Sequence, residues 1–104
     1  MHVTAIGADG GGKQELHPSV FQRVSRCIAD SVSQCFEKGD MSYARTAGTI
    51  DLSRVVEIGQ VVANPEEYRR RNDIEITVAD LTGLAVQDIQ IARYVYEQLL
   101  SLAE

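Results

Sequence analysis

A glycine-rich segment near the start of the chain carries the residues best suited to chemistry. Residues 7–16 have the sequence GADGGGKQEL and follow an apolar, β-prone run at 2–6. A glycine-rich turn that ends in Gly-Lys is typical of the P-loop, in which backbone amides bind phosphate and a Ser or Thr after the lysine binds magnesium. Gln14 stands in place of that hydroxyl, and Pro18 interrupts the helix that a P-loop requires unless it lies in the first turn. The segment therefore does not predict a nucleotide hydrolase.

Strands and helices alternate along the sequence. Apolar periodicity and turn residues predict strands at 2–8, 24–29 and 74–79, helices at 18–23, 32–38, 53–62 and from 83 to about 102, and a loop at 40–52. We expect Asp30 and Ser31 to cap the helix at 32–38, and Gly39 to end it in the left-handed conformation. This alternation predicts an α/β fold with a mostly parallel sheet.

The predicted fold locates a candidate site. In open parallel sheets, ligands bind beyond the carboxyl ends of the strands. Asp9 and Thr82 each follow the end of a predicted strand, so both would face one crevice if their strands are neighbours. The alternative is that the glycines form a tight turn and Asp9 is an Asx-type turn residue. From the residues alone, we favour the turn.

Composition and charge limit the classes of partner. The chain has 104 residues, 44% of them hydrophobic, and a net charge of -5. This size and composition suit one small folded domain, and the acidic balance argues against nucleic acid or an anionic membrane as a partner. The one basic cluster, at 69–71, lies between acidic residues, so we expect a solvated loop with local ion pairs.

Cysteine and histidine placement argues against a metal site. Cys27 and Cys35 lie in apolar or helical surroundings, so we expect small buried hydrophobic residues rather than a disulfide or a metal pair. His2 and His17 have no second ligand at metal-binding spacing. The sequence shows no signal-peptide pattern and no apolar run of the roughly 18 residues that a membrane span needs, so we expect a cytoplasmic protein.

Two motifs resemble a known family. GADGGGKQEL resembles the segment of the ornithine cyclodeaminase and mu-crystallin family in which a strand ends in Gly-Ala-Asp, followed by Gly-Lys-x-Glu-Leu. Residues 80–88, DLTGLAVQD, are similar to that family's late strand-to-helix junction. Two motifs in the right order are far more specific than either motif alone. The resemblance extends loosely through residues 30–31 and 57–61, and so covers nearly the whole chain.

The resemblance implies a partial Rossmann-like, doubly wound fold. Residues 1–104 would form a single domain, the C-terminal portion of an NAD(P)-binding domain. Family members are about threefold longer, with a substrate domain that dimerises and a Gly-x-Gly-x-x fingerprint that precedes this segment. The present sequence has no such fingerprint, so it looks like the C-terminal third of a longer enzyme. We expect the isolated chain to be inactive and not to retain NAD; it could also be a non-catalytic remnant that folds and self-associates.

The resemblance also implies roles for individual residues. Asp9 would be the catalytic acid and base, near the substrate amine, provided that burial or neighbours tune its pKa. Thr82 would contact the substrate. The implied cofactor contacts are Ala5, Ile6, Gly7, Ala8, Lys13 and Leu81. Some family members have Lys-Ser-Val where this chain has residues 80–82, Asp-Leu-Thr, which leaves the substrate open.

The activity implied by the resemblance is ornithine cyclodeamination, the NAD-dependent conversion of ornithine to proline with release of ammonia. The alternatives share its first hydride transfer: amino-acid dehydrogenation of the alanine type, imine reduction, and ectoine breakdown. NAD or NADP would be the cofactor and a small amino acid the substrate. We also expect a homo-oligomer, because a dinucleotide domain divided through its sheet leaves an edge strand and an apolar face open.

Overall fold

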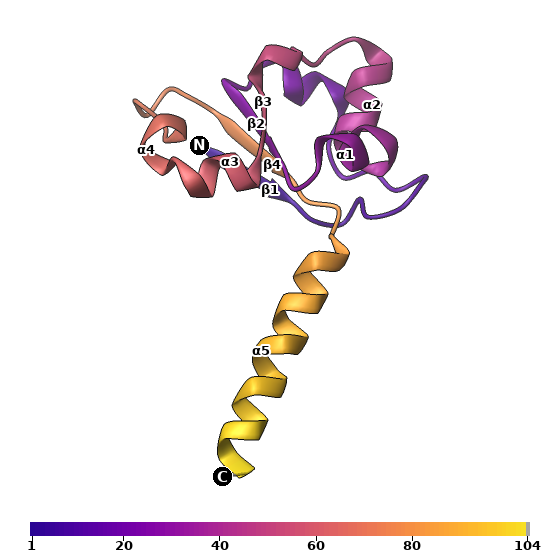
Figure 1. Ribbon diagram of the computed structural model, residues 1–104. Coiled ribbons are helices and arrows are strands. Elements are labelled where there is room, and N and C mark those ends of the chain that lie inside the picture. The colour runs from indigo at the N-terminus through magenta and orange to yellow at the C-terminus, as the bar shows by residue number, and fades with distance from the viewer. Residues whose placement is uncertain (104) are drawn as a thin grey trace.

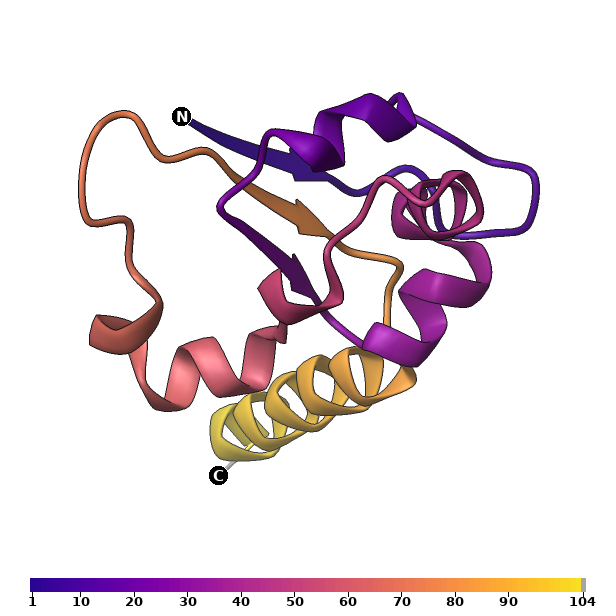
Figure 2. The same cartoon turned by 90° about the horizontal axis from the view of Figure 1, so that it is seen from above.

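The computed structural model describes residues 1–103, which form a parallel sheet with helices packed around it (Figures 1 and 2). The four strands lie in the order β1 (His2–Ala5), β4 (Thr77–Asp80), β2 (Arg26–Ala29) and β3 (Val55–Glu57). All three pairings are parallel, which confirms the predicted α/β architecture. Every residue of β4 is buried, and this strand lies inside the sheet between β1 and β2. The strand predicted at 74–79 from alternating apolar residues, which favoured one face as the more buried, was therefore wrong in its bounds, and both faces of β4 are buried.

Helices connect the strands and one of them leaves the domain. They are the 3-10 helices η1 (Pro18–Gln22) and η2 (Leu52–Arg54) and the α-helices α1 (Val32–Lys38), α2 (Asp40–Ala47), α3 (Ile58–Ala63), α4 (Pro65–Tyr68) and α5 (Ala85–Ala103). The predictions for α1, η1 and α5 are confirmed. Ser31 caps α1 by accepting a hydrogen bond from the Gln34 amide.

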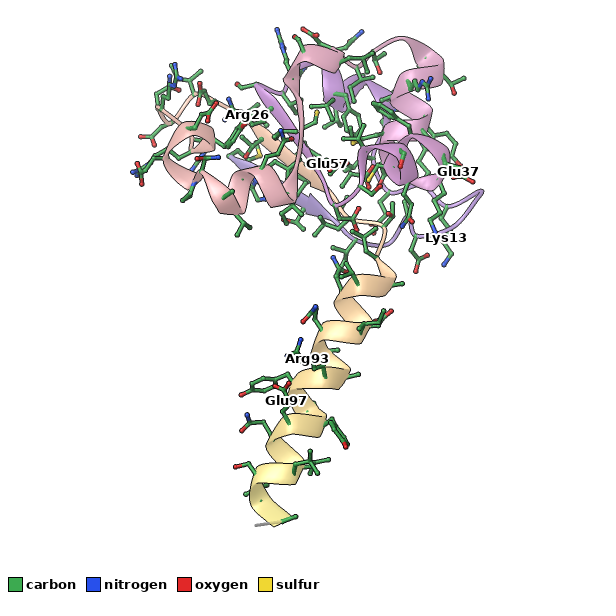
Figure 3. All side chains as sticks on the ribbon, in the orientation of Figure 1. Lys13, Arg26, Glu37, Glu57, Arg93 and Glu97 are labelled. Atoms are coloured by element: carbon green, nitrogen blue, oxygen red, sulfur yellow. The ribbon has the colours of Figure 1, made fainter. Side chains whose placement is uncertain are left out.

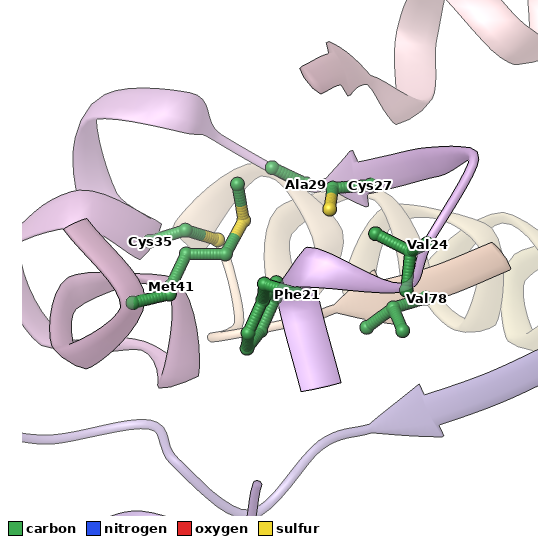
Figure 4. Close-up of a cluster of buried hydrophobic side chains, with 8 residues drawn as sticks. Phe21, Val24, Cys27, Ala29, Cys35, Met41 and Val78 are labelled. Atoms are coloured by element: carbon green, nitrogen blue, oxygen red, sulfur yellow. The ribbon is translucent and has the colours of Figure 1, made fainter. Parts of the chain in front are cut away.

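The hydrophobic core lies between the sheet and the group formed by η1, α1 and α2 (Figure 4). Phe21, Val24 and Val78 are almost completely buried there, and Met41 from α2 closes the cluster. Cys27 and Cys35 are free, buried thiols of this core, as the sequence predicted. Burial raises the pKa of each thiol to about 12, with the charge of Asp80 adding to the shift.

The prediction of a loop at 40–52 was wrong, because most of these residues form α2. Met41 and Ala44 occupy one face of that helix and are fully buried against the core, which supplies the stabilisation that local propensity does not. Gly39 is extended, with φ of -85°, and does not take the left-handed conformation predicted for it. That conformation occurs instead at Gly48, which ends α2 with φ of 69°.

The predicted helix at 53–62 is a strand followed by a short helix. Val55 and Val56 pair with β2 at the edge of the sheet, and this pairing overrides the helical pattern. Glu57 then begins α3 through reciprocal hydrogen bonds with Gln60, a capping box.

Helix α5 projects from the domain and gives the molecule principal extents of 55 × 34 × 19 Å (Figure 1). All its residues are exposed, including large apolar ones such as Ile91 and Leu99. Among residues 1–103, no helix combines the length and apolar character needed to cross a bilayer. The basic loop at 69–71 is exposed, with Arg69 paired to Glu66 at 3.0 Å.

Candidate active site at the carboxyl ends of the strands

The glycine-rich loop leaves the carboxyl end of β1 and closes on itself. The Lys13 amide donates to the Gly10 carbonyl at 3.2 Å, and Gly12 adopts φ of 82°, a conformation that favours glycine. At its base, the Gly7 amide donates to the Glu15 carboxylate. A Cβ at position 7 would lie 2.6 Å from the Glu15 carboxyl carbon, so only glycine fits this closure without movement.

Asp9 and Lys13 form an ion pair on this loop. The Lys13 Nζ lies 2.6 Å from Asp9 Oδ1, and the two side chains are 60% and 53% exposed. Figure 3 shows Lys13 on the side of the domain from which α5 leaves. The hydrogen bond and charge of Lys13 lower the pKa of Asp9, and the charge of Lys38 adds to this effect. Asp9 is therefore a carboxylate at neutral pH, available to accept a proton but not tuned to release one.

The segment after β4 lies directly beside the start of this loop. Ala5 and Asp80 are partners in the parallel register, and the Leu81 amide donates to the Ala5 carbonyl at 2.9 Å. The two strands are therefore neighbours, which was the condition for Asp9 and Thr82 to face one crevice. Thr82, however, is only 4% exposed. Its hydroxyl donates to Asp30 Oδ1 at 3.2 Å and accepts from Gln34 Nε2 at 2.8 Å, so it is engaged within the chain.

Asp30, at the carboxyl end of β2, holds the segment after β4 in place. Its Oδ2 accepts from the amides of Thr82 at 3.0 Å and Gly83 at 2.8 Å, and its Oδ1 accepts from the Ser31 amide at 2.9 Å. Burial alone would raise the pKa of Asp30, but the amide hydrogen bonds outweigh it and hold the pKa below its ordinary value. Gly83 has φ of 86°, so the chain turns sharply here before α5 begins.

Two more buried aspartates accept backbone hydrogen bonds next to the site. Asp40, at the start of α2, accepts at Oδ1 from the amides of Glu15 and Leu16, each at 2.8 Å. Asp80, at the end of β4, accepts at Oδ2 from the Met41 amide at 2.8 Å. The glycine-rich loop, α2 and β4 are thus joined through carboxylates.

The structure brings together most of the residues predicted for the site. Ala5 and Ala8 are small and buried, whereas Ile6 is 67% exposed and Asp9 extends into solvent. The side chains of Asp9 and Thr82 do not present to the same open space, because Thr82 points into the chain. The predicted contacts of these residues with cofactor and substrate stay predictions.

Sequence reasoning missed the support roles of Asp40 and Asp80, and gave Asp30 only a capping role. A signal was available, since Asp30 and Asp80 both directly follow or end an apolar strand. Asp40 had no such signal, because residues 40–52 were predicted to be a loop.

A cavity of about 520 Å³ lies between the glycine-rich loop and helices α1 and α2. Its charged lining residues are Glu37, Lys38 and Arg45, with the Arg45 guanidinium 5.2 Å from the centre of the Phe36 ring. This lining is charged and of mixed sign, unlike the mainly apolar pockets that hold organic cofactors. We therefore place the candidate active site at the strand ends and not in this cavity.

The family model of the ornithine cyclodeaminase/mu-crystallin family matches residues 1–102. The chain belongs to this family. It is 41% identical over 101 residues to an alanine dehydrogenase of Archaeoglobus fulgidus, covering 96% of this chain and 31% of the relative. It is 40% identical over 96 residues to an iminosuccinate reductase of Paracoccus denitrificans, covering 92% and 29%. A Δ1-pyrroline-2-carboxylate reductase of Bacillus cereus is 32% identical, covering 96% and 31%. The chain thus spans about a third of the length of these relatives.

Solved structures agree with this assignment. An archaeal alanine dehydrogenase dimer with bound NAD superposes with a TM-score of 0.85 at 39% identity, covering 99% of this chain and 32% of that one. The iminosuccinate reductase of Paracoccus denitrificans in complex with NAD+ gives a TM-score of 0.79 at 38% identity, covering 92% and 29%. The neighbours are therefore NAD-binding enzymes, and the predicted family and α/β fold are confirmed.

Proposed function

We propose that this chain forms the nicotinamide-facing part of the dinucleotide-binding domain in an NAD(P)-dependent amino-acid dehydrogenase or imine reductase. The observation that carries the proposal is the loop with Asp9 and Lys13 at the carboxyl end of β1, next to the end of β4. This loop occurs in a chain about 40% identical to a dehydrogenase and a reductase whose solved structures hold NAD.

The residues at the strand ends fit a nicotinamide nucleotide. Ile6 offers an exposed apolar side chain, while Ala5, Gly7 and Ala8 keep the surrounding backbone free of bulk. Lys13 offers an exposed ammonium that can offset phosphate charge or donate to a ribose hydroxyl. Leu81 directly follows β4 and lies at the same edge of the sheet, where its amide donates to the Ala5 carbonyl. When bound, NAD supplies the acceptor or donor of the hydride.

Asp9 is the residue to which we assign proton transfer. As a carboxylate, it can accept a proton from the substrate ammonium as the amine becomes an imine, and can return that proton in the reductive direction. Its present pKa is low because Lys13 bonds to it. If Lys13 turns toward the cofactor, Asp9 loses that partner and becomes a stronger base. We assign Thr82 to the substrate side, through a rearrangement of its bonds to Asp30 and Gln34.

Ornithine cyclodeaminase activity, which the sequence resemblance favoured, is the second candidate. The family model supports it in name, whereas the relatives at about 40% identity support the dehydrogenase or reductase. The two can be told apart by redox balance. A dehydrogenase leaves NADH, whereas a cyclodeaminase releases ammonia with no net reduction of NAD. In either case we propose a small amino-acid substrate and a homo-oligomer.

A chimera tests the proposal. Residues 1–102 replace the matching segment of the Archaeoglobus fulgidus alanine dehydrogenase, to which they are 41% identical over 101 residues. We expect a chimera that binds NAD and reduces it in the presence of alanine, followed by NADH absorbance. A folded chimera that binds no NAD contradicts the proposal. Ammonia release from ornithine without net NADH would favour the second candidate.

A further inference from the structure

One side chain from outside the glycine-rich loop, that of Asp40, hydrogen-bonds to the end of this loop. Asp40 lies in the first turn of α2 and is completely buried. Its Oδ1 accepts the amides of Glu15 and Leu16, which are 25 and 24 residues distant in sequence. Glu15 in turn holds the Gly7 amide at the base of the loop. The position of the loop that carries Asp9 and Lys13 therefore depends on Asp40, together with the burial of Ala8 and the packing of Leu16 on the core.

The second carboxylate, Asp80, lies against the same turn of backbone. Asp80 Oδ2 accepts the Met41 amide at 2.8 Å. A Cβ at Gly39 would be 2.6 Å from that oxygen and 3.0 Å from Asp80 Oδ1, so glycine at 39 allows this approach. Within the part of the chain that the structure describes, Asp80 Oδ1 and Asp40 Oδ2 are buried oxygens with no hydrogen-bond partner. A buried carboxylate oxygen without a partner is unfavourable while it carries charge.

The groups around Asp80 are mostly acidic. Asp40 from α2 and Asp30 from the end of β2 both act on it as negative charges. The Cys35 thiol of α1 donates to the Asp80 carbonyl, and the charge of Asp80 contributes to the raised pKa of Cys27 in β2. Burial, with the charge of Asp40, raises the pKa of Asp80 to about 6, against two backbone amides that lower it.

We propose that Asp40 is a positioning residue for the glycine-rich loop, and that a proton on Asp80 controls how firmly Asp40 holds it. With the proton, Asp80 carries no charge and α2 packs closely on β4. Without it, a buried Asp80 charge lies beside Asp40 across the Gly39 turn, and the hydrogen bonds from Glu15 and Leu16 to Asp40 weaken. That this alters the placement of Asp9 at an active site rests on the proposed function.

The direction of the pH effect follows from the raised pKa of Asp80. Because the folded state binds the proton more tightly than the unfolded chain, this group favours folding at low pH, and the contribution is lost as the pH rises to about 6. The loop should be held most firmly below about pH 6 and less firmly above it.

Nuclear magnetic resonance on the 104-residue chain tests the proposal without any cofactor. The carboxyl carbon of Asp80 and the amides of Glu15 and Leu16 are followed from about pH 4 to 8. We expect all three to shift with one midpoint near 6 in the wild type. Asp88→Asn, on the exposed helix α5, is the matched control. In this variant the three signals should shift with the same midpoint as in the wild type.

Two variants separate the charge of Asp40 from its hydrogen bonds. Asp40→Asn keeps an acceptor for the loop amides and removes the charge, so the Asp80 midpoint should fall while the amides of Glu15 and Leu16 stay protected from exchange. Asp40→Ala removes the acceptor, and exchange of both amides should accelerate at least about tenfold at every pH. Where Asp40→Ala does not fold, Asp80→Asn replaces it and should abolish the shared titration while the amides stay protected.

Three results would overturn the proposal. One is that the loop amides do not titrate together with Asp80. Another is that Asp40→Asn exposes the two amides to exchange, and the third is that Asp40→Ala leaves their exchange unchanged. None of these measurements depends on NAD or a substrate. Their failure would therefore leave the proposed function untouched, and an inactive chimera would leave this proposal standing.

Discussion

Asp30 is the residue on which the β4 side of the candidate site depends most. It accepts the backbone amides of Ser31, Thr82 and Gly83 and is 6% exposed. Asp30→Ala leaves these donors without an acceptor, so we expect the free energy of unfolding to fall by about 2–4 kcal/mol in urea denaturation. Asp51→Ala is the matched control, because Asp51 caps η2 at an exposed site and its loss should lower the free energy of unfolding much less.

The contribution of Asp30 should also depend on pH. Its pKa is lowered in the folded state, so its stabilisation is present above the ordinary value of 3.8 and is lost as the pH falls through the folded-state pKa. The stability difference between wild type and Asp30→Ala should therefore be full at pH 7 and shrink below about pH 4. A difference that stays constant down to pH 3 would show that the carboxylate charge contributes nothing.

At the scale of elements, the sequence predicted those that carry their own local signals. Helix α1 was predicted with its observed bounds, because Ser31 caps it and no Pro or Gly occurs within residues 32–38. Helix α5 was predicted from its apolar spacing alone. In contrast, α2 and β3 depend on tertiary contacts: Met41 on the core, and Val55 and Val56 on the edge of β2. No local pattern contains that information.

Gly39 shows how a misassigned glycine can reveal packing between elements. It was predicted from its position after α1 to be a left-handed cap, yet it is extended and lies against Asp80 and Thr82. Gly39→Ala would place a Cβ 2.6 Å from Asp80 Oδ2 and 2.9 Å from Thr82 Cγ2. Because both neighbours are buried, we expect a loss of about 1–3 kcal/mol in the free energy of unfolding.

Gly59 is the matched control for Gly39. It lies in α3 with open space where a Cβ would be, so Gly59→Ala should stabilise the chain by up to about 1 kcal/mol. Both values come from the same urea denaturation series. Equal effects of the two substitutions would show that the approach of Gly39 to Asp80 is not tight.

At the scale of the whole molecule, α5 projects from the domain with large apolar side chains exposed along its length. Ile91, Val95 and Leu99 recur at helical spacing and are all about half exposed or more. We expect the isolated chain to self-associate through this face, as a dimer or larger assembly. Light scattering should show Val95→Glu with Leu99→Glu to be monomeric, while Gln90→Glu, on the polar side, leaves association unchanged. A wild-type chain that stays monomeric at high concentration would contradict this.

The location of the candidate site at the strand ends could be predicted, for a specific reason. The GADGGGKQEL and DLTGLAVQD motifs resemble a family, and parallel strands place their carboxyl ends at one edge. The sequence therefore predicted that two segments about seventy residues apart lie near one another in the fold. The direction of the Thr82 side chain could not, because it depends on Asp30 and Gln34, which reach it from other elements. The lowering of the Asp9 pKa by Lys13 could not be predicted either, because it depends on the distance between the two side chains.

Kinetics of one substitution test most directly whether Asp9 moves a proton at an NAD-dependent active site. In the alanine dehydrogenase chimera, Asp9→Asn keeps the shape and much of the hydrogen bonding but removes the base. We predict that kcat falls on the order of a hundredfold or more while NAD binding barely changes. Asp51→Asn, at another exposed aspartate beside a basic residue, should leave kcat unchanged. Because Asn serves as well as Asp in an Asx turn, near-wild-type turnover of Asp9→Asn would place Asp9 in a turn and outside the active site.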